Sequence, residues 1–229
     1  MVLEEKTKQA LGVLERAAAD HAPAVLATSL GAEDMVLTDL VAKRFPAVEI
    51  FTLDTGRLNP ETYELLAEVR SRYGRGIRVY FPDAAEVEAF VNQHGPNAFY
   101  EGVGLRKTCC YVRKVAPLKR ALAGKGAWIT GLRREQSPER QEVALIEWDA
   151  ANGLYKVNPL ADWTNEDVWA YLRAHGVPCN RLHDRGYASI GCAPCTRPIR
   201  PGEDFRAGRW WWEESAEKEC GLHPVPASV

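Results

Sequence analysis

Short apolar runs alternate with amphipathic stretches through the first part of the chain. Buried strands are predicted at residues 24–28, 48–53, 77–81 and 127–131, and helices at 35–44, 61–72, 84–93 and 106–123. A further amphipathic helix is expected at the N-terminus, through Arg16. Alternation at this spacing predicts an α/β fold, a doubly wound and mostly parallel sheet flanked by helices.

The second part of the chain is less regular. Residues 143–148 and 154–157 have the pattern of a hairpin at a sheet edge, and Thr164 has the position of an N-cap for a helix that runs to His175. After Pro178, frequent glycines and prolines leave no room for a long helix, so this segment needs something other than a core to hold it. Residues 213–229 are polar and contain prolines near the end, as is typical of a mobile tail. We expect a single domain over residues 1–212 and a mobile C-terminal tail over 213–229.

Three loops follow predicted strands, at the edge of a parallel sheet where ligands bind. The first, from Ser29 to Asp34, leads into a helix and suits a phosphate, although it lacks the lysine of a Walker A loop and the three glycines of a dinucleotide fingerprint. The candidate ligand-binding residues in the three loops are Ser29, Leu30, Gly31, Asp34, Leu53, Asp54, Thr55, Gly56, Gly131 and Arg133.

The composition is that of an ordinary soluble protein. The 229 residues are 46% hydrophobic and 26% charged, with a net charge of -2. The N-terminal stretch is charged and no run of 18 apolar residues occurs, so we expect neither export nor membrane insertion, and a cytoplasmic location. In a reducing compartment the six cysteines are better explained as metal ligands or catalytic thiols than as disulfides.

One stretch stands out by charge. From Gly102 to Arg134 there is no Asp or Glu, and the cations are Arg106, Lys107, Arg113, Lys114, Lys119, Arg120, Lys125, Arg133 and Arg134. In a chain of nearly balanced charge this is a local basic field, which predicts an anionic ligand.

Two cysteine pairs are the strongest chemical signal. Cys109 and Cys110 are adjacent within the basic stretch, and Cys192 and Cys195 form a C-x-x-C pair downstream. Adjacent thiols chelate a single zinc ion awkwardly, whereas an iron-sulfur cluster offers separate irons, so a cluster is favoured; zinc, a redox disulfide and unligated core thiols remain alternatives. Lys114, four residues after Cys110, would share its helical face, where a solvated lysine is the alternative.

The C-terminal segment holds a second kind of thiol. Cys220 lies in a polar sequence where a structural cysteine would have little to pack against, which makes it a nucleophile candidate. Arg206 and Arg209 offer guanidinium groups to an oxyanion, and the three tryptophans that follow are expected to anchor the tail by packing.

These motifs, in this order, resemble the assimilatory adenosine-5'-phosphosulfate (APS) reductases of bacteria, relatives of the phosphoadenosine-phosphosulfate (PAPS) reductases. The resemblance covers nearly the whole chain and rests most on Cys109-Cys110, Cys192-Ala193-Pro194-Cys195 and Glu219-Cys220-Gly221-Leu222-His223. It implies a fold like that of the adenine-nucleotide alpha hydrolases. In this chain Leu30 stands where their loop has a glycine and Met35 where it has a serine, which argues against pyrophosphate release from ATP.

The resemblance also implies a cofactor, a nucleophile and a substrate site. It places a 4Fe-4S cluster on Cys109, Cys110, Cys192 and Cys195, and makes Cys220 the nucleophile. Lys114, Arg206 and Arg209 would hold the phosphosulfate, while the Ser29 loop, Leu53 and Gly131 would frame the AMP part.

The implied reaction is thioredoxin-dependent reduction of APS to sulfite and AMP through a Cys S-sulfonate, in sulfate assimilation and cysteine biosynthesis. The four cysteines favour APS, because PAPS-specific enzymes lack them. The alternatives are a PAPS or dual-specificity reductase, an ATP-dependent tRNA thiolation enzyme with a cluster, and a cluster-bearing regulator that binds nucleic acid. No helix-turn-helix signal supports the last, so the expected partners are APS and thioredoxin, without nucleic acid or membrane and with a possible homo-oligomer.

Overall fold

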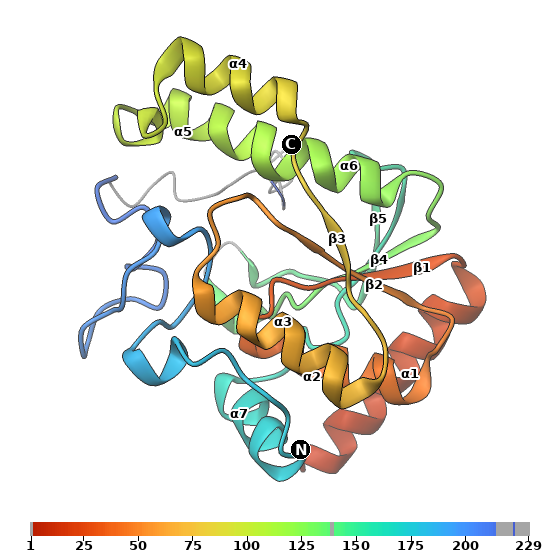
Figure 1. Ribbon diagram of the computed structural model, residues 1–229. Helices are drawn as coiled ribbons and strands as arrows, with labels where there is room; N and C mark the ends of the chain where they lie inside the picture. The colour runs from red at the N-terminus through yellow and green to blue at the C-terminus, as the bar shows by residue number, and fades with distance from the viewer. Residues whose placement is uncertain (1, 138–139, 214–221, 223–229) are drawn as a thin grey trace. The chain divides into compact units, whose positions relative to one another are not determined.

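Six strands form one mostly parallel sheet in the order β3-β2-β1-β4-β6-β5 (Figure 1). The computed structural model describes residues 2–137, 140–213 and 222. The strands are β1 (Ala24–Ala27), β2 (Glu49–Leu53), β3 (Arg78–Tyr80), β4 (Ala127–Ile129), β5 (Ile146–Asp149) and β6 (Leu154–Val157). The helices are α1 (Leu3–Asp20), α2 (Ala32–Arg44), α3 (Pro60–Tyr73), α4 (Ala84–His94), α5 (Val103–Cys110), α6 (Ala116–Leu122) and α7 (Asn165–Ala174).

The central strands are apolar because the sheet buries them on both faces. Val25 and Leu26 of β1 are fully buried, as is Ile129 of β4. β1 pairs in parallel with both β2 and β4, and β4 pairs in parallel with β6. The strand order therefore reverses at β1 and β4, and the carboxyl ends of these two strands border the switch point where such sheets bind ligands.

The predicted hairpin closes one edge of the sheet. β5 pairs antiparallel with β6, from Ile146 opposite Val157 to Asp149 opposite Leu154. The prediction of a hairpin is confirmed, although its first strand begins at Ile146 rather than at residue 143. The α/β fold with a mostly parallel sheet flanked by helices is likewise confirmed.

The chain divides into two compact units. The first comprises Met1–Thr52, Pro60–Arg78 and Leu122–Arg181, and the second comprises Leu53–Asn59, Val79–Ala121 and the described part of Leu182–Val229. In the first unit α1, α2, α3 and α7 contribute apolar side chains to one core with the sheet.

Thr164 caps α7 as expected: its hydroxyl accepts from the Asp167 amide at 3.1 Å.

One helix predicted in the second unit differs from the observed structure. The expected helix at 106–123 is interrupted by η2, a π-helical segment (Tyr111–Val115), between α5 and α6. The widened turn changes the exact register between Cys110 and Lys114, but both residues still line the same pocket, as the shared face predicted. The sequence pattern missed this because a local widening leaves the apolar periodicity on either side intact.

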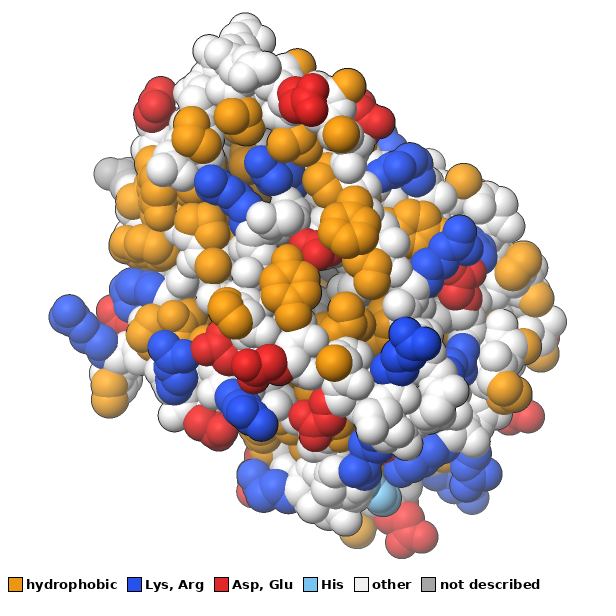
Figure 2. Space-filling model, viewed as in Figure 1, with side chains coloured by type: hydrophobic (Ala, Val, Ile, Leu, Met, Phe, Trp, Pro, Cys, Tyr) orange, Lys and Arg blue, Asp and Glu red, His pale blue; other side chains and the backbone are white. Residues whose placement is uncertain are grey.

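The basic stretch is partly neutralised by ion pairs. Among the described residues, several of its cations pair with acids from elsewhere in the chain, including Arg106 with Glu213, Lys125 with Glu49, Arg133 with Glu33 and Arg134 with Asp162. On the face shown in Figure 2, Lys and Arg side chains are interspersed with Asp and Glu. Tertiary contacts therefore neutralise part of the local basic field that the sequence predicted.

The remaining expectations concern extent and location. The single domain over 1–212 stays a prediction, and nearly all of the predicted tail, with Cys220, lies outside the described residues. Within the described residues, no helix has the length and apolarity needed to cross a membrane.

Candidate functional site

The loop after β1 is a tight turn closed by an acid of α2. The amide and the hydroxyl of Ser29 both donate to Asp34 Oδ2, each at 2.6 Å. Leu30, which follows Ser29 in this turn, is 1% exposed and has a φ of 60°. This left-handed conformation favours glycine, which explains why a glycine suits the same place in related loops and why leucine carries strain there.

The carboxyl of Asp34, in the first turn of α2, has an unusually high pKa. Burial raises its pKa to about 6, the hydrogen bonds from Ser29 act in the opposite direction, and the charge of Glu33 raises it further. The candidate phosphate loop thus contains a carboxyl that is protonated a little below neutral pH.

The loop after β4 packs directly on the start of α2. A methyl group added at Gly131 would stand 2.4 Å from Asp34 Oδ1 and 3.1 Å from Glu33 Cβ. Gly131 is therefore required by close approach, not by its backbone conformation. The two loops that border the switch point are in contact.

Arg133 fixes this contact. Its guanidinium is buried and donates to Glu33 Oε1 at 2.9 and 3.0 Å, to Glu135 at 2.9 Å and to the Trp163 carbonyl at 3.2 Å. Sequence analysis missed Glu33 as the partner. The only available signal was an acid in the first turn of α2, which is common at helix N-termini for other reasons.

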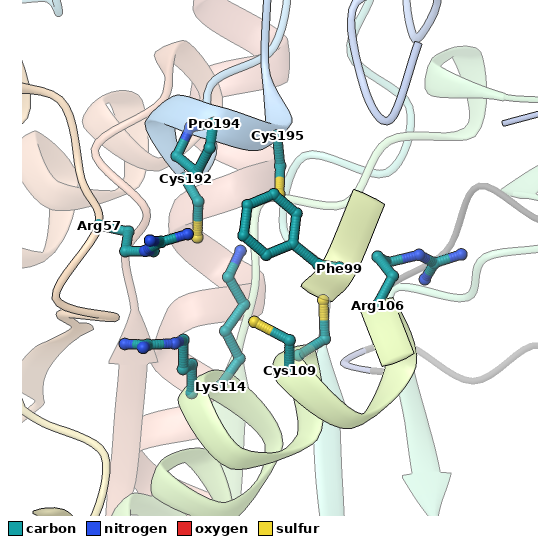
Figure 3. Close-up of a pocket in the computed structure, with 10 residues that line it drawn as sticks. Arg57, Phe99, Arg106, Cys109, Lys114, Cys192, Pro194 and Cys195 are labelled. Carbon is teal, nitrogen blue, oxygen red and sulfur yellow. The ribbon is translucent and has the colours of Figure 1, made fainter. Parts of the chain in front are cut away.

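The four predicted cysteine ligands lie together in the second unit. Cys109 and Cys110 end α5, Cys192 precedes a short 3-10 turn (Ala193–Cys195), and Cys195 is the last residue of that turn. All four are buried and line one pocket (Figure 3). The other lining residues are Arg57, Phe99, Arg106, Arg113, Lys114 and Pro194.

The loop after β2 holds the C-x-x-C segment. Thr55 Oγ1 lies 3.2 Å from Cys192 Sγ, and the Ala193 amide donates to the Arg57 carbonyl at 2.8 Å. Arg113 Nη1 donates to the Thr55 carbonyl at 2.7 Å, which ties η2 to the same loop. The predicted residues Thr55 and Lys114 are thus brought to the four thiols.

The remaining predicted residues of this loop shape the turn. Asp54 Oδ1 accepts from the Gly56 amide at 2.8 Å, and Gly56 has a φ of 72°. Leu53 ends β2, directly before the turn.

The pocket contains two thiols with raised pKa values, and cationic side chains lie close to them. Burial, and then the charges of Cys192 and Cys110, raise the pKa of Cys195 to about 12, while Lys114 and Arg209 act in the opposite direction. Burial also raises the pKa of Cys109, against the charge of Arg113. Figure 3 shows Lys114 directed toward the sulfur atoms. Arg57 and Arg113 were not among the predicted residues, although both are cations near predicted ones in the sequence.

These thiols fit a group that takes four thiolates. Five cysteines are described, and all of them are free thiols, so none of these forms a disulfide. Four buried thiols from two segments of the chain around one pocket are the kind of donor set that an iron-sulfur cluster takes. The fifth described cysteine, Cys179, is partly buried and packs against the core of the first unit.

Arg206 and Arg209 lie in the segment that follows the C-x-x-C turn. The Arg209 amide donates to the Arg206 carbonyl at 2.9 Å, and Arg209 forms an isolated antiparallel bridge with Thr196. Trp210 is 1% exposed and packs in an apolar cluster with the four cysteines, while its expected role as an anchor of the tail stays a prediction.

The chain is similar to known proteins over most of its length. The model of the phosphoadenosine phosphosulfate reductase domain matches residues 23–198. The adenosine 5'-phosphosulfate reductase of Allochromatium vinosum is 58% identical over 87% of this chain and 78% of its own, and that of Burkholderia cepacia is 53% identical over 99% and 93%.

Solved structures agree. The phosphoadenylyl-sulfate (PAPS) reductase of Candida auris, solved as a phosphate complex, is 30% identical, with a TM-score of 0.72 over 85% of this chain and 96% of its own. The FMN adenylyltransferase of Candida glabrata, at 14% identity and a TM-score of 0.58 over 99% and 80%, shares the fold alone. The chain thus belongs to the phosphoadenosine phosphosulfate reductase family and is an enzyme of its adenosine 5'-phosphosulfate reductase branch.

Proposed function

We propose that the chain reduces APS to sulfite and AMP, with a 4Fe-4S cluster held by Cys109, Cys110, Cys192 and Cys195. The observation that carries the proposal is that these thiols, from two distant segments, line one pocket with Lys114. Three relatives at 58%, 53% and 50% identity are APS reductases by name. When bound, the cluster supplies a fixed scaffold and local charge rather than reducing electrons.

In this proposal one group of residues binds the nucleotide and another binds the phosphosulfate. Ser29, Leu30, Gly31, Asp34 and Gly131 frame the nucleotide, with Leu53, Asp54, Thr55 and Gly56 contributing from the loop after β2. Arg133 holds Glu33 and so keeps the Ser29 and Gly131 loops together. Lys114, Arg206 and Arg209 donate to the phosphosulfate oxygens and offset the charge that develops as the sulfonate is transferred.

Cys220 is the nucleophile in this proposal. Its thiolate attacks the sulfur of APS, the bond from that sulfur to the phosphate oxygen breaks, and AMP leaves with the bonding pair. A dithiol reductant, thioredoxin, then attacks the Cys220 sulfur and releases sulfite. The resulting mixed disulfide is resolved by the second thiol of the reductant, so the two electrons come from that dithiol.

The test is sulfite release from APS with thioredoxin and its reductase, with cluster absorbance recorded on the same sample. The protein should release sulfite and AMP in equal amounts. Cys220→Ser should bind APS but form no protein-bound sulfonate, and an intact mass that carries the adduct in this variant contradicts the assignment.

A second candidate is turnover of PAPS, alone or alongside APS, because the chain is also similar to the PAPS reductase of Candida auris. The two nucleotides are compared at equal concentration in the same assay. Faster turnover of PAPS than of APS would replace the first proposal by the second.

A further inference from the structure

The guanidinium of Arg209 lies against the backbone of Gly191. A methyl group built at Gly191 would stand 2.6 Å from Arg209 Cζ, and 2.6 Å from each of its terminal nitrogens. Three equal distances mean that the planar group faces the glycine Cα. Any side chain at position 191 would occupy the place of this guanidinium.

The indole ring of Trp210 also contacts the Arg209 guanidinium. Arg209 Cζ is 4.9 Å from the centroid of the indole ring, within the range of a cation-π contact. Arg209 Nε is buried and has no hydrogen-bond partner among the described residues. Stacking on Trp210 and close packing against Gly191 therefore hold the guanidinium.

Trp210 adopts this position at a cost. Its φ is 41°, in the left-handed region that a bulky side chain rarely enters, and its side chain is almost fully buried. Strain of this kind persists only where the surroundings impose it, and it occurs mainly at functional sites.

A buried ion pair holds the tryptophan. Arg106 Cζ is 4.5 Å from the same ring, and its guanidinium donates two hydrogen bonds to Glu213, at 2.9 and 2.8 Å. The side chains of Arg106 and Glu213 are 0% and 5% exposed. Figure 3 shows Arg106 directed away from the cysteine sulfurs, in agreement with this pairing.

The backbone of Arg209 is fixed as well. The Trp210 amide donates to the Cys195 carbonyl at 3.2 Å, and the Arg197 amide donates to the Gly208 carbonyl at 3.0 Å. These bonds flank the bridge between Arg209 and Thr196. The Arg209 side chain thus starts from a backbone attached to the C-x-x-C segment.

From these contacts we infer that Gly191 and Trp210 are positioning residues for Arg209, and that the Arg106–Glu213 pair holds Trp210 in place. The inference rests on the proposed role of Arg209 in binding the phosphosulfate. A guanidinium already held in its binding orientation loses little freedom when the anion arrives, so affinity and rate depend on the groups that hold it.

Gly191→Ala tests the inference without disturbing the backbone, because the added methyl meets only the end of a flexible side chain. We expect kcat/KM for APS to fall about 10- to 100-fold, the loss typical of a misplaced charge-assisted hydrogen bond. Cluster absorbance per chain and far-UV circular dichroism should not change. Gly12→Ala is the matched control, because a methyl there has nothing within 4 Å, and it should keep wild-type kcat/KM.

The decisive measurement is a double-mutant cycle. In an Arg209→Ala background, Gly191→Ala should have no further effect on kcat/KM, because the residue that it displaces is gone. In an Arg209→Lys background the effect should be under about twofold, since an ammonium has no planar face to lay on the glycine. Trp210→Phe should give a smaller loss that also disappears in the Arg209→Ala background.

Three results would overturn the inference: kcat/KM within about twofold of wild type in Gly191→Ala, an effect that adds fully in the Arg209→Ala background, or loss of cluster absorbance in Gly191→Ala. If wild-type protein released no sulfite from APS, the proposed function itself would fail, which is a different outcome.

Discussion

Replacing Asp34 by Asn should remove a specific pH dependence of stability. Burial raises the pKa of this carboxyl from 3.8 to about 6. The folded protein then keeps the proton at a higher pH than the unfolded chain does. Consequently, the free energy of unfolding falls as the pH rises from about 4 to about 6, and the full loss remains above that range.

The size of the effect follows from the shift. Ionising Asp34 in the folded state costs at most about 3 kcal/mol, at about 1.4 kcal/mol per pH unit, and the partial exposure of the side chain makes this an upper figure. Between pH 5 and pH 7 alone the loss is about 1.3 kcal/mol. In Asp34→Asn the amide oxygen can still accept from Ser29, and this part of the pH dependence should be absent.

The direct assay is carbon NMR of protein labelled at the aspartate carboxyl groups, from pH 5 to pH 8. The resonance missing from Asp34→Asn identifies the group, and it should titrate near pH 6. Urea unfolding of both proteins at pH 5 and pH 7 checks the energy. A carboxyl that is already fully ionised at pH 5 would refute the reasoning, because burial would then not outweigh the hydrogen bonds from Ser29.

Three further predictions concern packing, charge and ligation. Gly131→Ala should lower the free energy of unfolding by about 1–3 kcal/mol in urea titrations, because the methyl meets the Asp34 carboxylate; wild-type stability would contradict the close approach. Arg133→Met should cost about 3–5 kcal/mol in the same assay by leaving buried acids unpaired, and a change below about 1 kcal/mol would count against the ion pairs as supports. Cys192→Ser should reduce bound iron and cluster absorbance while the matched Cys179→Ser keeps both; equal iron in the two variants would remove Cys192 from the ligand set.

Local features were predictable from the sequence. The cap at Thr164 depends on residues three apart, and the strands β1 and β4 are continuous apolar runs between turn signals. The cysteine pairs also stood out, because adjacent thiols in a basic stretch have few structural explanations. In these cases the physics acts between near neighbours in the chain.

The supports of the candidate sites were not predictable. Arg133 pairs with Glu33 across 100 positions, Arg106 with Glu213 across 107, and Thr55 meets Cys192 across 137. Many acids could have paired with either arginine, and no local pattern selects one. The π segment after Cys110 was missed because a single widened turn does not alter the surrounding periodicity.

By itself, the sequence determined the fold class, the order of strands and helices, and the residue types that carry chemistry, since hydrophobic periodicity and thiol spacing are properties of near neighbours. Only the tertiary structure decided which cations are neutralised, which thiols share a pocket, and why position 191 must lack a side chain. These depend on distances between segments far apart in the chain, which are set by packing of the whole fold.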